Sequence, residues 1–250
     1  MRQQRHGQVL HVLARQERIS VTELSSMLGV SEVTVRHDLD ALAQAGLLRR
    51  TRGGAARVLE TEQALEASSL RHVAAKRRIG RAAAALVRSG DTIFLDVGST
   101  TTEIARSLSP TLQGVLVVTN GLNIALELER LPNVEVMVTG GRLRRLQHSL
   151  VNPYALELLG HIHADWLFLG CNGVHPERGV TNANFEEAEV KAGMVARSRE
   201  VVVVADHSKL GAVSRAQITG LEQVTTLITD KQPGQFMTDY AAQVGRVLCV

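Results

Sequence analysis

A loop with one glycine and four hydroxyl side chains occupies residues 96–102, Asp-Val-Gly-Ser-Thr-Thr-Thr, between an apolar run and a helical segment. Gly98 would let the backbone come close to a ligand, and free N–H groups at the start of a helix attract anions. The hydroxyls that can donate hydrogen bonds belong to Ser99, Thr100 and Thr101. The same residues are typical of an ordinary Ser/Thr cap on a strand-to-helix turn. The loop alone therefore leaves anion binding and simple capping open.

Three further loops of small polar residues follow predicted strands. They are Thr119-Asn120-Gly121, Thr139-Gly140-Gly141 and Gly170-Cys171-Asn172-Gly173. In an open parallel sheet, the carboxyl ends of the strands face one crevice where ligands bind. Together with the loop at Asp96, these groups suit a hydroxyl-rich, phosphorylated ligand better than an apolar one. No Gly-x-Gly-x-x-Gly opens the first helix, so the dinucleotide-binding pattern is absent.

Charged side chains with alternative roles lie further along the chain. Glu187 and Lys191 fall on one predicted helix, where they could form an ordinary i,i+4 ion pair or line a pocket. Asp206 and Lys209 follow an apolar run and could equally be surface charges. Glu187 or Asp206 could also be the general base of an enzyme, but spacing alone does not show that geometry.

A helix predicted from Ser31 to about residue 45 has two different faces. Val35, Leu39 and Leu42 lie on one face at i, i+4 and i+7, which would dock the helix on its neighbours. The opposite face is predicted to enter a DNA major groove, because arginine can pair with guanine and an apolar group can contact a thymine methyl. Hydroxyls near the helix start can bind phosphates. The predicted contacts on this helix are Ser31, Glu32, Val33, Thr34, Arg36 and His37.

Two short strands predicted at residues 47–51 and 55–59 flank a Gly-Gly turn and would form a wing. Arg50 and Arg52, beside this turn, could reach phosphates or a minor groove. A three-helix bundle with a solvated polar face would show the same helix spacing, but the arginine-rich wing favours DNA binding.

The excess of basic over acidic side chains lies entirely in the first quarter of the chain. Residues 1–60 hold nine arginines and six acids, whereas residues 61–250 hold nineteen basic and nineteen acidic side chains. A polyanion would therefore bind the first segment. Aromatic residues make up only 3% of the 250 residues, which disfavours base stacking and RNA binding.

The remaining composition excludes several classes of protein. The chain has two cysteines, too few for a disulfide framework or a thiolate metal site, and we expect no metal or cofactor. No apolar run approaches the ~18 residues of a membrane span, and no leader pattern opens the sequence. A soluble, cytoplasmic protein without a membrane partner is expected.

The elements that must position these groups form two predicted domains. Residues 1–59 are expected to hold three helices, over residues 3–16, 21–28 and 31–45, followed by the wing. Residues 60–72 are polar and lack apolar periodicity, so they are predicted to be a linker.

Residues 73–250 are predicted to form a mostly parallel, Rossmann-like α/β domain, because β-branched runs that alternate with helices are typical of strands buried on both faces. The predicted strands cover residues 92–97, 115–119, 134–139, 166–169, 201–205, 224–229 and 247–250. The predicted helices cover residues 73–88, 100–108, 121–131, 153–160, 184–198 and 235–244.

The segment from Val21 to Ala55 resembles the amino-terminal domain of the DeoR family of bacterial regulators. The matching motifs are Val30-Ser31, Thr34-Val35, Arg36, Asp38-Leu39 and Gly53-Gly54-Ala55. His37 stands where the family usually has a second arginine. The resemblance implies a winged helix-turn-helix that binds double-stranded operator DNA.

From about residue 73 to 230 the chain is similar to the sensor domain of the same family, which is akin to ribose-5-phosphate isomerase and glucosamine-6-phosphate deaminase. Asn152-Pro153 departs from the pattern, because family members often have glycine there. The resemblance implies a phosphorylated sugar as effector, with its phosphate on residues 98–101. The expected ligand contacts are Asp96, Gly98, Ser99, Thr100, Thr101, Thr119, Asn120, Gly140, Gly141, Asn172, Glu187, Lys191, Asp206 and Lys209.

Two classes of function fit these features. The leading hypothesis is a repressor of a carbohydrate-metabolism operon that the sugar phosphate releases from DNA, although an activator would have the same features. The alternative is a sugar-phosphate isomerase or deaminase with an appended DNA-binding domain. We expect no catalysis, because the basic winged domain has no use in an enzyme. Helix-turn-helix proteins commonly bind two half-sites, so a homo-oligomer, either a dimer or a tetramer, is expected.

Overall fold

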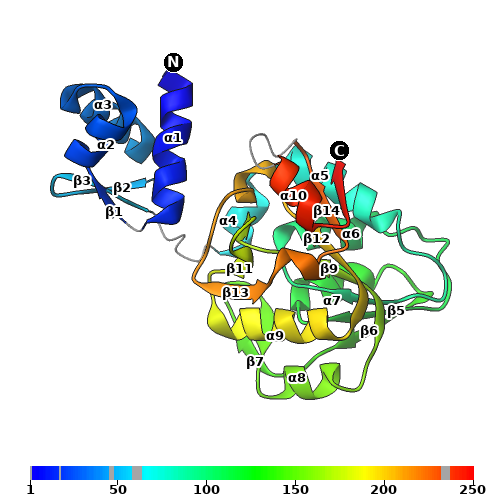
Figure 1. Ribbon diagram of the computed structural model, residues 1–250. Helices are drawn as coiled ribbons and strands as arrows, with labels where there is room; N and C mark the ends of the chain where they lie inside the picture. Colours follow the sequence, from blue (N-terminus) through cyan, green and yellow to red (C-terminus); the bar gives the residue numbers. More distant parts are fainter. Residues whose placement is uncertain (1, 17, 45–47, 58–63, 232–236) are drawn as a thin grey trace. The chain divides into compact units, whose positions relative to one another are not determined.

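The computed structural model describes residues 2–16, 18–44, 48–57, 64–231 and 237–250 (Figure 1). The chain divides into two compact units, Met1–Thr61 and Glu62–Val250, which we call unit 1 and unit 2. Among the helices of the described residues, none has the length and apolar character that crossing a bilayer would require.

The described residues of unit 1 form three helices and an antiparallel sheet with the strand order β1-β3-β2. Its elements are α1 (Arg2–Arg15), β1 (Arg18–Ser20), α2 (Val21–Leu28), α3 (Glu32–Gln44), β2 (Leu48–Thr51) and β3 (Gly54–Arg57). The expected helices and hairpin are present, whereas the three-residue strand β1 was not predicted. Residues 45, 47, 58 and 59, which the predicted helix and strands included, lie outside the described residues.

The turn of the wing differs from the expectation. Thr51 pairs with Gly54, so Arg52 and Gly53 form the turn and Gly54 belongs to β3. A Cβ on Gly54 would lie 2.1 Å from the carbonyl oxygen of Ile19. Only glycine therefore allows β3 to lie this close to β1.

An apolar core and a buried carboxylate fix α3 within unit 1. Val35, Leu39 and Leu42 are at most 3% exposed and share a core with residues of α1 and α2. Asp38 accepts hydrogen bonds from Arg5, whose Nη2 lies 3.2 Å from Oδ1, and its Oδ1 lies 3.0 Å from His6 Nε2. Asp38 itself is only 2% exposed, so this network ties α1 to α3.

Unit 2 is built around a seven-stranded parallel sheet with the strand order β15-β14-β12-β9-β4-β5-β6. The strands are β4 (Thr92–Leu95), β5 (Val115–Thr119), β6 (Val134–Val138), β9 (Ala164–Leu169), β12 (Ser198–Val204), β14 (Thr226–Thr229) and β15 (Arg246–Cys249). Each overlaps one of the apolar runs that predicted a strand, although several ends shift. The predicted α/β class is confirmed.

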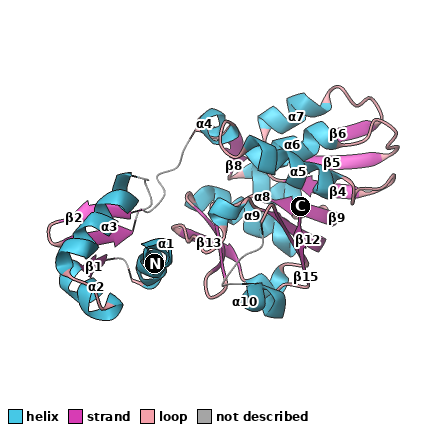
Figure 2. Cartoon of the chain, turned by 90° about the horizontal axis from the view of Figure 1, so that it is seen from above, coloured by secondary structure: helices cyan, strands magenta, loops and turns pink. Residues whose placement is uncertain are grey.

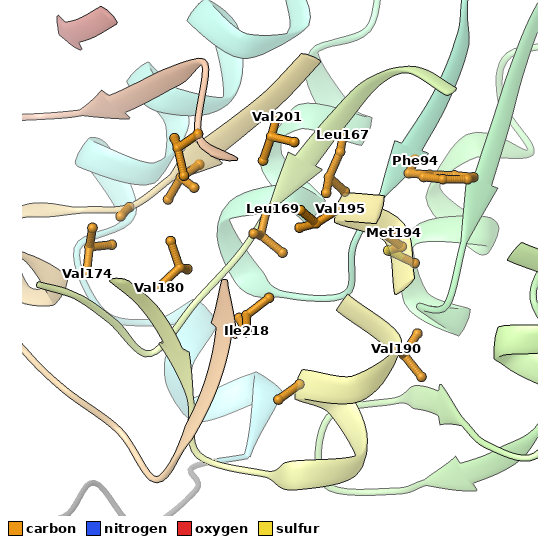
Figure 3. Packing of buried hydrophobic residues seen from close by; sticks show 14 of the residues in the cluster. Phe94, Leu167, Leu169, Val174, Val180, Val190, Met194, Val195, Val201 and Ile218 are labelled. Atoms are coloured by element: carbon orange, nitrogen blue, oxygen red, sulfur yellow. The ribbon is translucent and has the colours of Figure 1, made fainter. Parts of the chain in front are cut away.

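Helices cover both faces of this sheet (Figure 2). One face packs on α5 (Val73–Ala84), α6 (Ser99–Ser107) and α7 (Leu122–Leu128), and the other packs on α8 (Tyr154–Leu159), α9 (Phe185–Ala196) and α10 (Met237–Gln243). Neighbouring residues of a strand point to opposite faces of the sheet. Ile93 and Leu95 therefore belong to the first core, under α5, α6 and α7, and Phe94 belongs to the second core, under α8, α9 and α10. Figure 3 shows the second core, in which Leu167 and Met194 accompany Phe94.

Several short elements beside this sheet were not predicted. A smaller antiparallel sheet consists of β10 (Gly173–His175), β11 (Gly179–Asn182) and β13 (Ala216–Thr219), and a hairpin consists of β7 (Arg142–Arg144) and β8 (Ser149–Val151). Two 3-10 turns, η1 (His207–Lys209) and η2 (Leu221–Gln223), follow β12 and β13. Strands of three or four residues show no clear alternation of apolar and polar side chains, and their pairing depends on packing with distant segments.

A helix lies in the segment that was predicted to be the linker. α4 (Leu65–Ser69) belongs to unit 2, and Leu65 is 5% exposed. Leu65 N donates to the carbonyl oxygen of Leu146 at 2.9 Å, and Lys76 Nζ donates to that of Ser68 at 2.5 Å. Five residues of the segment that was predicted to be the linker therefore form a helix of unit 2. A helix this short owes its stability to such contacts rather than to a sequence period.

We predict that Asp38→Asn lowers the free energy of unfolding of unit 1 at neutral pH by about 1–3 kcal/mol, because it weakens charge-assisted hydrogen bonds from Arg5 and His6. Burial by itself would raise the pKa of Asp38, but the hydrogen bonds from Arg5 and His6 outweigh it and hold that pKa below its ordinary value of 3.8. The stabilisation is therefore complete above pH 3.8 and is lost as the pH falls through the lowered pKa.

Hydrogen–deuterium exchange of α1 and α3 peptides, followed in urea on the full chain, measures this effect. Asp40→Asn is the matched control, because Asp40 is exposed on the same helix and pairs with Arg50 near the surface. Equal exchange in the two variants would contradict the role of Asp38.

Candidate functional sites

The exposed side of α3 carries the residues that were predicted to contact DNA. Val33 is 59% exposed, and Arg36 and His37 are exposed beside it. Ser31 is exposed at the start of the helix, whereas Glu32 and Thr34 are half-buried. The structure thus places Val33, Arg36 and His37 on the side of α3 that faces away from the core, with Glu32 and Thr34 at its edges and Ser31 just before the helix. An exposed valine next to a guanidinium offers complementary contacts for a thymine methyl and a guanine edge.

Hydrogen bonds orient several of these side chains in the free protein. Glu32 accepts one from Thr22 Oγ1 at 2.9 Å and one from Arg36 Nη2 at 2.7 Å. Ser31 Oγ accepts one from Thr34 N at 3.3 Å and therefore caps α3. Arg36 can exchange Glu32 for a base, because an exposed ion pair of this kind contributes at most about 1 kcal/mol.

The two predicted wing arginines lie in different surroundings. Arg50 Nη1 donates to the carbonyl oxygen of Gly54 at 2.7 Å, and its Nε lies 2.8 Å from Asp40 Oδ1. Arg52 is exposed in the turn between β2 and β3. Arg50 is therefore engaged inside unit 1, and Arg52 is better placed to reach a phosphate.

In unit 2, the parallel strands bring most of the predicted ligand residues to one edge of the sheet. Asp96 follows β4, and Asn120 follows β5. Gly140 and Gly141 come after β6, and Asp206 comes after β12. The strand order β12-β9-β4-β5-β6 arranges these carboxyl ends side by side. We call this region the strand-end site.

A buried ion pair lies at the centre of the strand-end site. Asp96 is 0% and Lys191 is 2% exposed. Asp96 Oδ2 accepts hydrogen bonds from Lys191 Nζ and, at 3.0 Å, from Gly170 N, while Lys191 Nζ also donates to the carbonyl oxygen of Gly170 at 3.0 Å. Burial raises the pKa of Asp96 to about 6, although Lys191 opposes this increase. The pair joins the ends of β4 and β9 to α9.

Two buried polar atoms at this site have no hydrogen-bond partner within the described part of the chain. They are Asp96 Oδ1 and Asn120 Nδ2. The amide of Asn120 has a fixed orientation, because its Oδ1 accepts from Val97 N at 2.9 Å. An unpaired buried acceptor and donor cost free energy unless a ligand or water pairs with them. A ligand that bears hydroxyls can pair with both.

The start of α6 offers backbone donors to an anion. Gly98 has φ 153° and ψ 164°, a conformation essentially limited to glycine. The hydroxyls of Thr101 and Thr102 donate to the carbonyl oxygen of Gly98 at 2.9 and 2.6 Å, so their protons hold the loop together. No described side chain caps α6. The backbone N–H groups near Ser99 and Thr100, rather than the Thr101 hydroxyl, are therefore the donors best placed for an anion.

Three predicted contacts support the backbone of the strand-end site. Thr119 Oγ1 accepts from Gly121 N at 3.0 Å, and Asn172 Oδ1 accepts from Ala183 N at 2.8 Å. A Cβ on Gly141 would lie 1.9 Å from a carbonyl oxygen of β8, so this position requires glycine. These contacts favour a structural role for the three residues.

Glu187 is held by side chains other than Lys191, so the simple i,i+4 pair that the spacing allowed is not the arrangement found. Its Oε1 accepts from Arg144 Nη1 and Ser149 Oγ, and its Oε2 accepts from Asn182 Nδ2 at 3.2 Å. Both oxygens therefore anchor neighbouring segments. This bonding favours a structural role for Glu187 over that of a general base.

Asp206 lies at the β12 end of the strand-end site and interacts electrostatically with the buried ammonium group of Lys76. Its Oδ1 accepts from Ser208 N at 2.9 Å, and Lys209 is half-buried. Lys76 of α5 was not predicted as a site residue, yet it is 5% exposed. Burial lowers the pKa of Lys76, Asp206 opposes that decrease and Lys209 adds to it. Lys76 lies three positions before the apolar Ile79, so both fall on the same face of the helix. This spacing was the sequence signal that could have indicated that Lys76 is buried.

A separate hollow of about 740 Å³ lies elsewhere on unit 2, beside α7 and the turn of the β7–β8 hairpin. Leu122, Leu126 and Leu143 line it together with Arg130 and His148, among others. Five of its eight lining residues are polar or charged, although apolar atoms supply most of its exposed wall.

Two family models match the chain and together cover most of it. The DeoR-like helix-turn-helix domain matches residues 5–61, and the DeoR C terminal sensor domain matches residues 71–231.

Two regulators are similar to the chain over most of their length. It is 38% identical over 229 residues to the HTH-type transcriptional regulator GlpR of Haloferax volcanii. That alignment covers 91% of this chain and 89% of the relative. The chain is also 34% identical over 246 residues to the HTH-type transcriptional repressor GlcR of Bacillus subtilis. That alignment covers 97% of this chain and 93% of the relative.

A solved structure of ribose 5-phosphate isomerase from Plasmodium falciparum aligns with a TM-score of 0.40 and 16% identity, over 54% of this chain and 51% of that chain. Similarity at that level says nothing about activity.

We predict that the buried ion pair of unit 2 behaves as one energetic unit. Lys191→Met should lower the free energy of unfolding by about 3–5 kcal/mol, because it leaves the Asp96 carboxylate buried without its cation. The double variant Asp96→Asn, Lys191→Met should lose less than the sum of the two single variants. Urea unfolding followed by fluorescence of Trp166, the one tryptophan of the chain, measures unit 2 selectively. Strictly additive losses would show that the two groups are not coupled.

Proposed function

Because this chain belongs to the DeoR family of transcriptional regulators, we propose that it is a DNA-binding repressor of carbohydrate-metabolism genes that a phosphorylated sugar releases from its operator. The observation that carries the DNA-binding part is the exposed face of α3, where Val33, Arg36 and His37 lie together in a unit rich in arginine. The relatives described above are named as a transcriptional regulator and a transcriptional repressor.

On DNA, α3 enters the major groove with its exposed face toward the bases. Arg36 leaves Glu32 and pairs with a guanine, while Val33 contacts a thymine methyl. The capped start of α3 and the exposed Arg52 contact phosphates on either side. His37 lies beside Arg36 and contributes to the same readout. Together these contacts would give sequence preference through α3 and general affinity through the wing.

The effector occupies the strand-end site. Its phosphate lies against the backbone N–H groups at the start of α6, where Gly98 leaves room for close approach. Its hydroxyls pair with Asp96 Oδ1 and Asn120 Nδ2, the two buried atoms that have no partner among the described residues. The ammonium groups of Lys76 and Lys209 add positive charge nearby, which favours an anionic ligand.

Release from DNA requires the sugar phosphate to bind one arrangement of the protein more tightly than another. A difference of about 1–3 kcal/mol between the two arrangements is typical of allosteric coupling. We further propose that the protein acts as a homo-oligomer, because one helix-turn-helix reads only one half-site.

Catalysis is the less favoured function. An isomerase or deaminase would need a positioned and available carboxylate base, and both oxygens of Glu187 already accept hydrogen bonds. Steady turnover of phosphorylated aldoses by the purified protein, abolished by Glu187→Gln, would reverse this conclusion.

For DNA binding, we predict that Arg36→Ala weakens operator binding by about 1–3 kcal/mol and relaxes the preference at one base pair, because it removes a paired contact to a guanine. Arg52→Ala should weaken binding to operator DNA and to random DNA about equally. It should also reduce the salt dependence of the binding constant by the equivalent of about one phosphate contact.

Fluorescence anisotropy with operator and random duplexes at several salt concentrations measures both effects. Arg18→Ala is the control, since Arg18 is an exposed arginine of the same unit that lies outside the proposed contacts. An unchanged footprint of Arg36→Ala would remove α3 from its assigned role.

For the effector, we predict that a cognate sugar phosphate at about 100 times its Kd stabilises unit 2 by about 2.7 kcal/mol. A thermal-shift screen against a panel of phosphorylated sugars, read through Trp166, would identify it. The shift should vanish in Gly98→Val, Thr101→Ala, which alters the phosphate loop, and persist in Thr111→Ala, an exposed threonine beyond α6. A shift that survives the loop variant would place the phosphate elsewhere.

A further inference from the structure

Three side chains of the kinds that coordinate metal ions lie together near the end of β12. His72, Asp206 and His207 each offer one ligand atom, and these atoms all lie within 4.8 Å of one another. His72 precedes α5, whereas Asp206 caps η1 and His207 begins it, so folding brings together residues that are far apart in the sequence.

The backbone and the ring geometry of this cluster favour a shared ligand. His72 has φ 50° and ψ 36°, a left-handed conformation that is uncommon for a residue other than glycine. Its ring meets that of His207 edge to face, with centroids 4.8 Å apart and an interplanar angle of 78°. An uncommon backbone conformation thus holds an exposed imidazole against the second one.

The surroundings of Asp206 and His207 resemble the outer shell of a metal site. His207 Nδ1 lies 3.1 and 3.0 Å from the two carboxylate oxygens of Asp230, which leaves Nε2 as its coordinating atom. Asp206 Oδ1 accepts two hydrogen bonds from Ser208, which leaves Oδ2 for an ion. A carboxylate that orients a histidine from its far nitrogen is the usual second shell of a histidine-bound metal.

We propose that His72, Asp206 and His207 bind a borderline divalent metal ion of the Zn²⁺ class. Two imidazoles and one carboxylate form a common three-residue set for such an ion, with a fourth tetrahedral position left for water or another oxygen donor. Bonds of about 2.0–2.1 Å require ligand atoms roughly 3.4 Å apart, so the cluster must contract. The exposed side chain of His72 can make that movement.

The charges around the cluster select the class of ion. The ammonium group of Lys76, which interacts electrostatically with both Asp206 and Lys209, opposes any cation, whereas the Asp230 carboxylate attracts one. Arg78, which lies 3.8 Å from Asp230, offsets part of that attraction. A hard ion such as Mg²⁺ or Ca²⁺ depends on several oxygen ligands and would be excluded, while an ion that bonds well to imidazole would not. This inference does not depend on the proposed function.

The test is isothermal titration calorimetry of the full-length, tag-free protein with ZnCl₂ alone, supported by the visible spectrum of added Co²⁺. We expect one saturable ion per chain and the intense absorption of a tetrahedral site. His207→Ala and His72→Asn should each weaken binding roughly tenfold or more, and Asp230→Asn should weaken it by a smaller factor. Asparagine at residue 72 tolerates the left-handed backbone, so that variant retains the fold.

His163→Ala is the matched control, because His163 is an exposed histidine of unit 2 away from the cluster, and it should bind as the natural chain does. Three results would each overturn the proposal: no saturable binding, affinity that is unchanged in His72→Asn, or a thiolate charge-transfer band that places Co²⁺ on the exposed Cys249.

Discussion

The strand-end site depends on the rule that a charge withdrawn from water needs an opposite charge in contact with it. Asp96 and Lys191 are 95 positions apart in the sequence, and their contact joins the end of β4 to α9. Both groups also bond to the backbone at Gly170, so β9 is held in the same network. Such a pair contributes little net stability, but it penalises every arrangement that separates its members. It therefore fixes the geometry around the one Asp96 oxygen that remains available to a ligand.

Most of the large sheet could be predicted from the sequence, because strands buried on both faces need continuous apolar runs, such as those ending at Leu95 and Val204. The short strands could not. The segment Arg142–Arg144 is polar, and it pairs with β8 through contacts that no local pattern encodes. Helix α4 was assigned to the linker for the same reason, since one turn of helix shows no period and is held by Leu146 and Lys76.

The location of the candidate site was easier to predict than the role of each residue in it. Loops at the carboxyl ends of parallel strands must converge, so Asp96 and Asn120 were expected near one another. Spacing could not show that Glu187 binds Arg144 and Ser149, or that Arg50 turns back toward Asp40, because both contacts depend on tertiary packing. In Lys76-Arg77-Arg78 the three cations look alike in sequence, and only the helix phase distinguishes the buried one from its exposed neighbours.

The strand order of unit 2 also has a consequence for how the polypeptide acquires its structure on the ribosome. Every described strand pair of unit 1 forms within residues 18–57, so the winged domain can close early in translation. In unit 2 the first strand, β4, lies between β5 and β9, and β9 in turn awaits β12. The nascent chain therefore cannot pair β9 on both sides until β12, which ends at Val204, has emerged, so unit 2 completes its sheet later than unit 1.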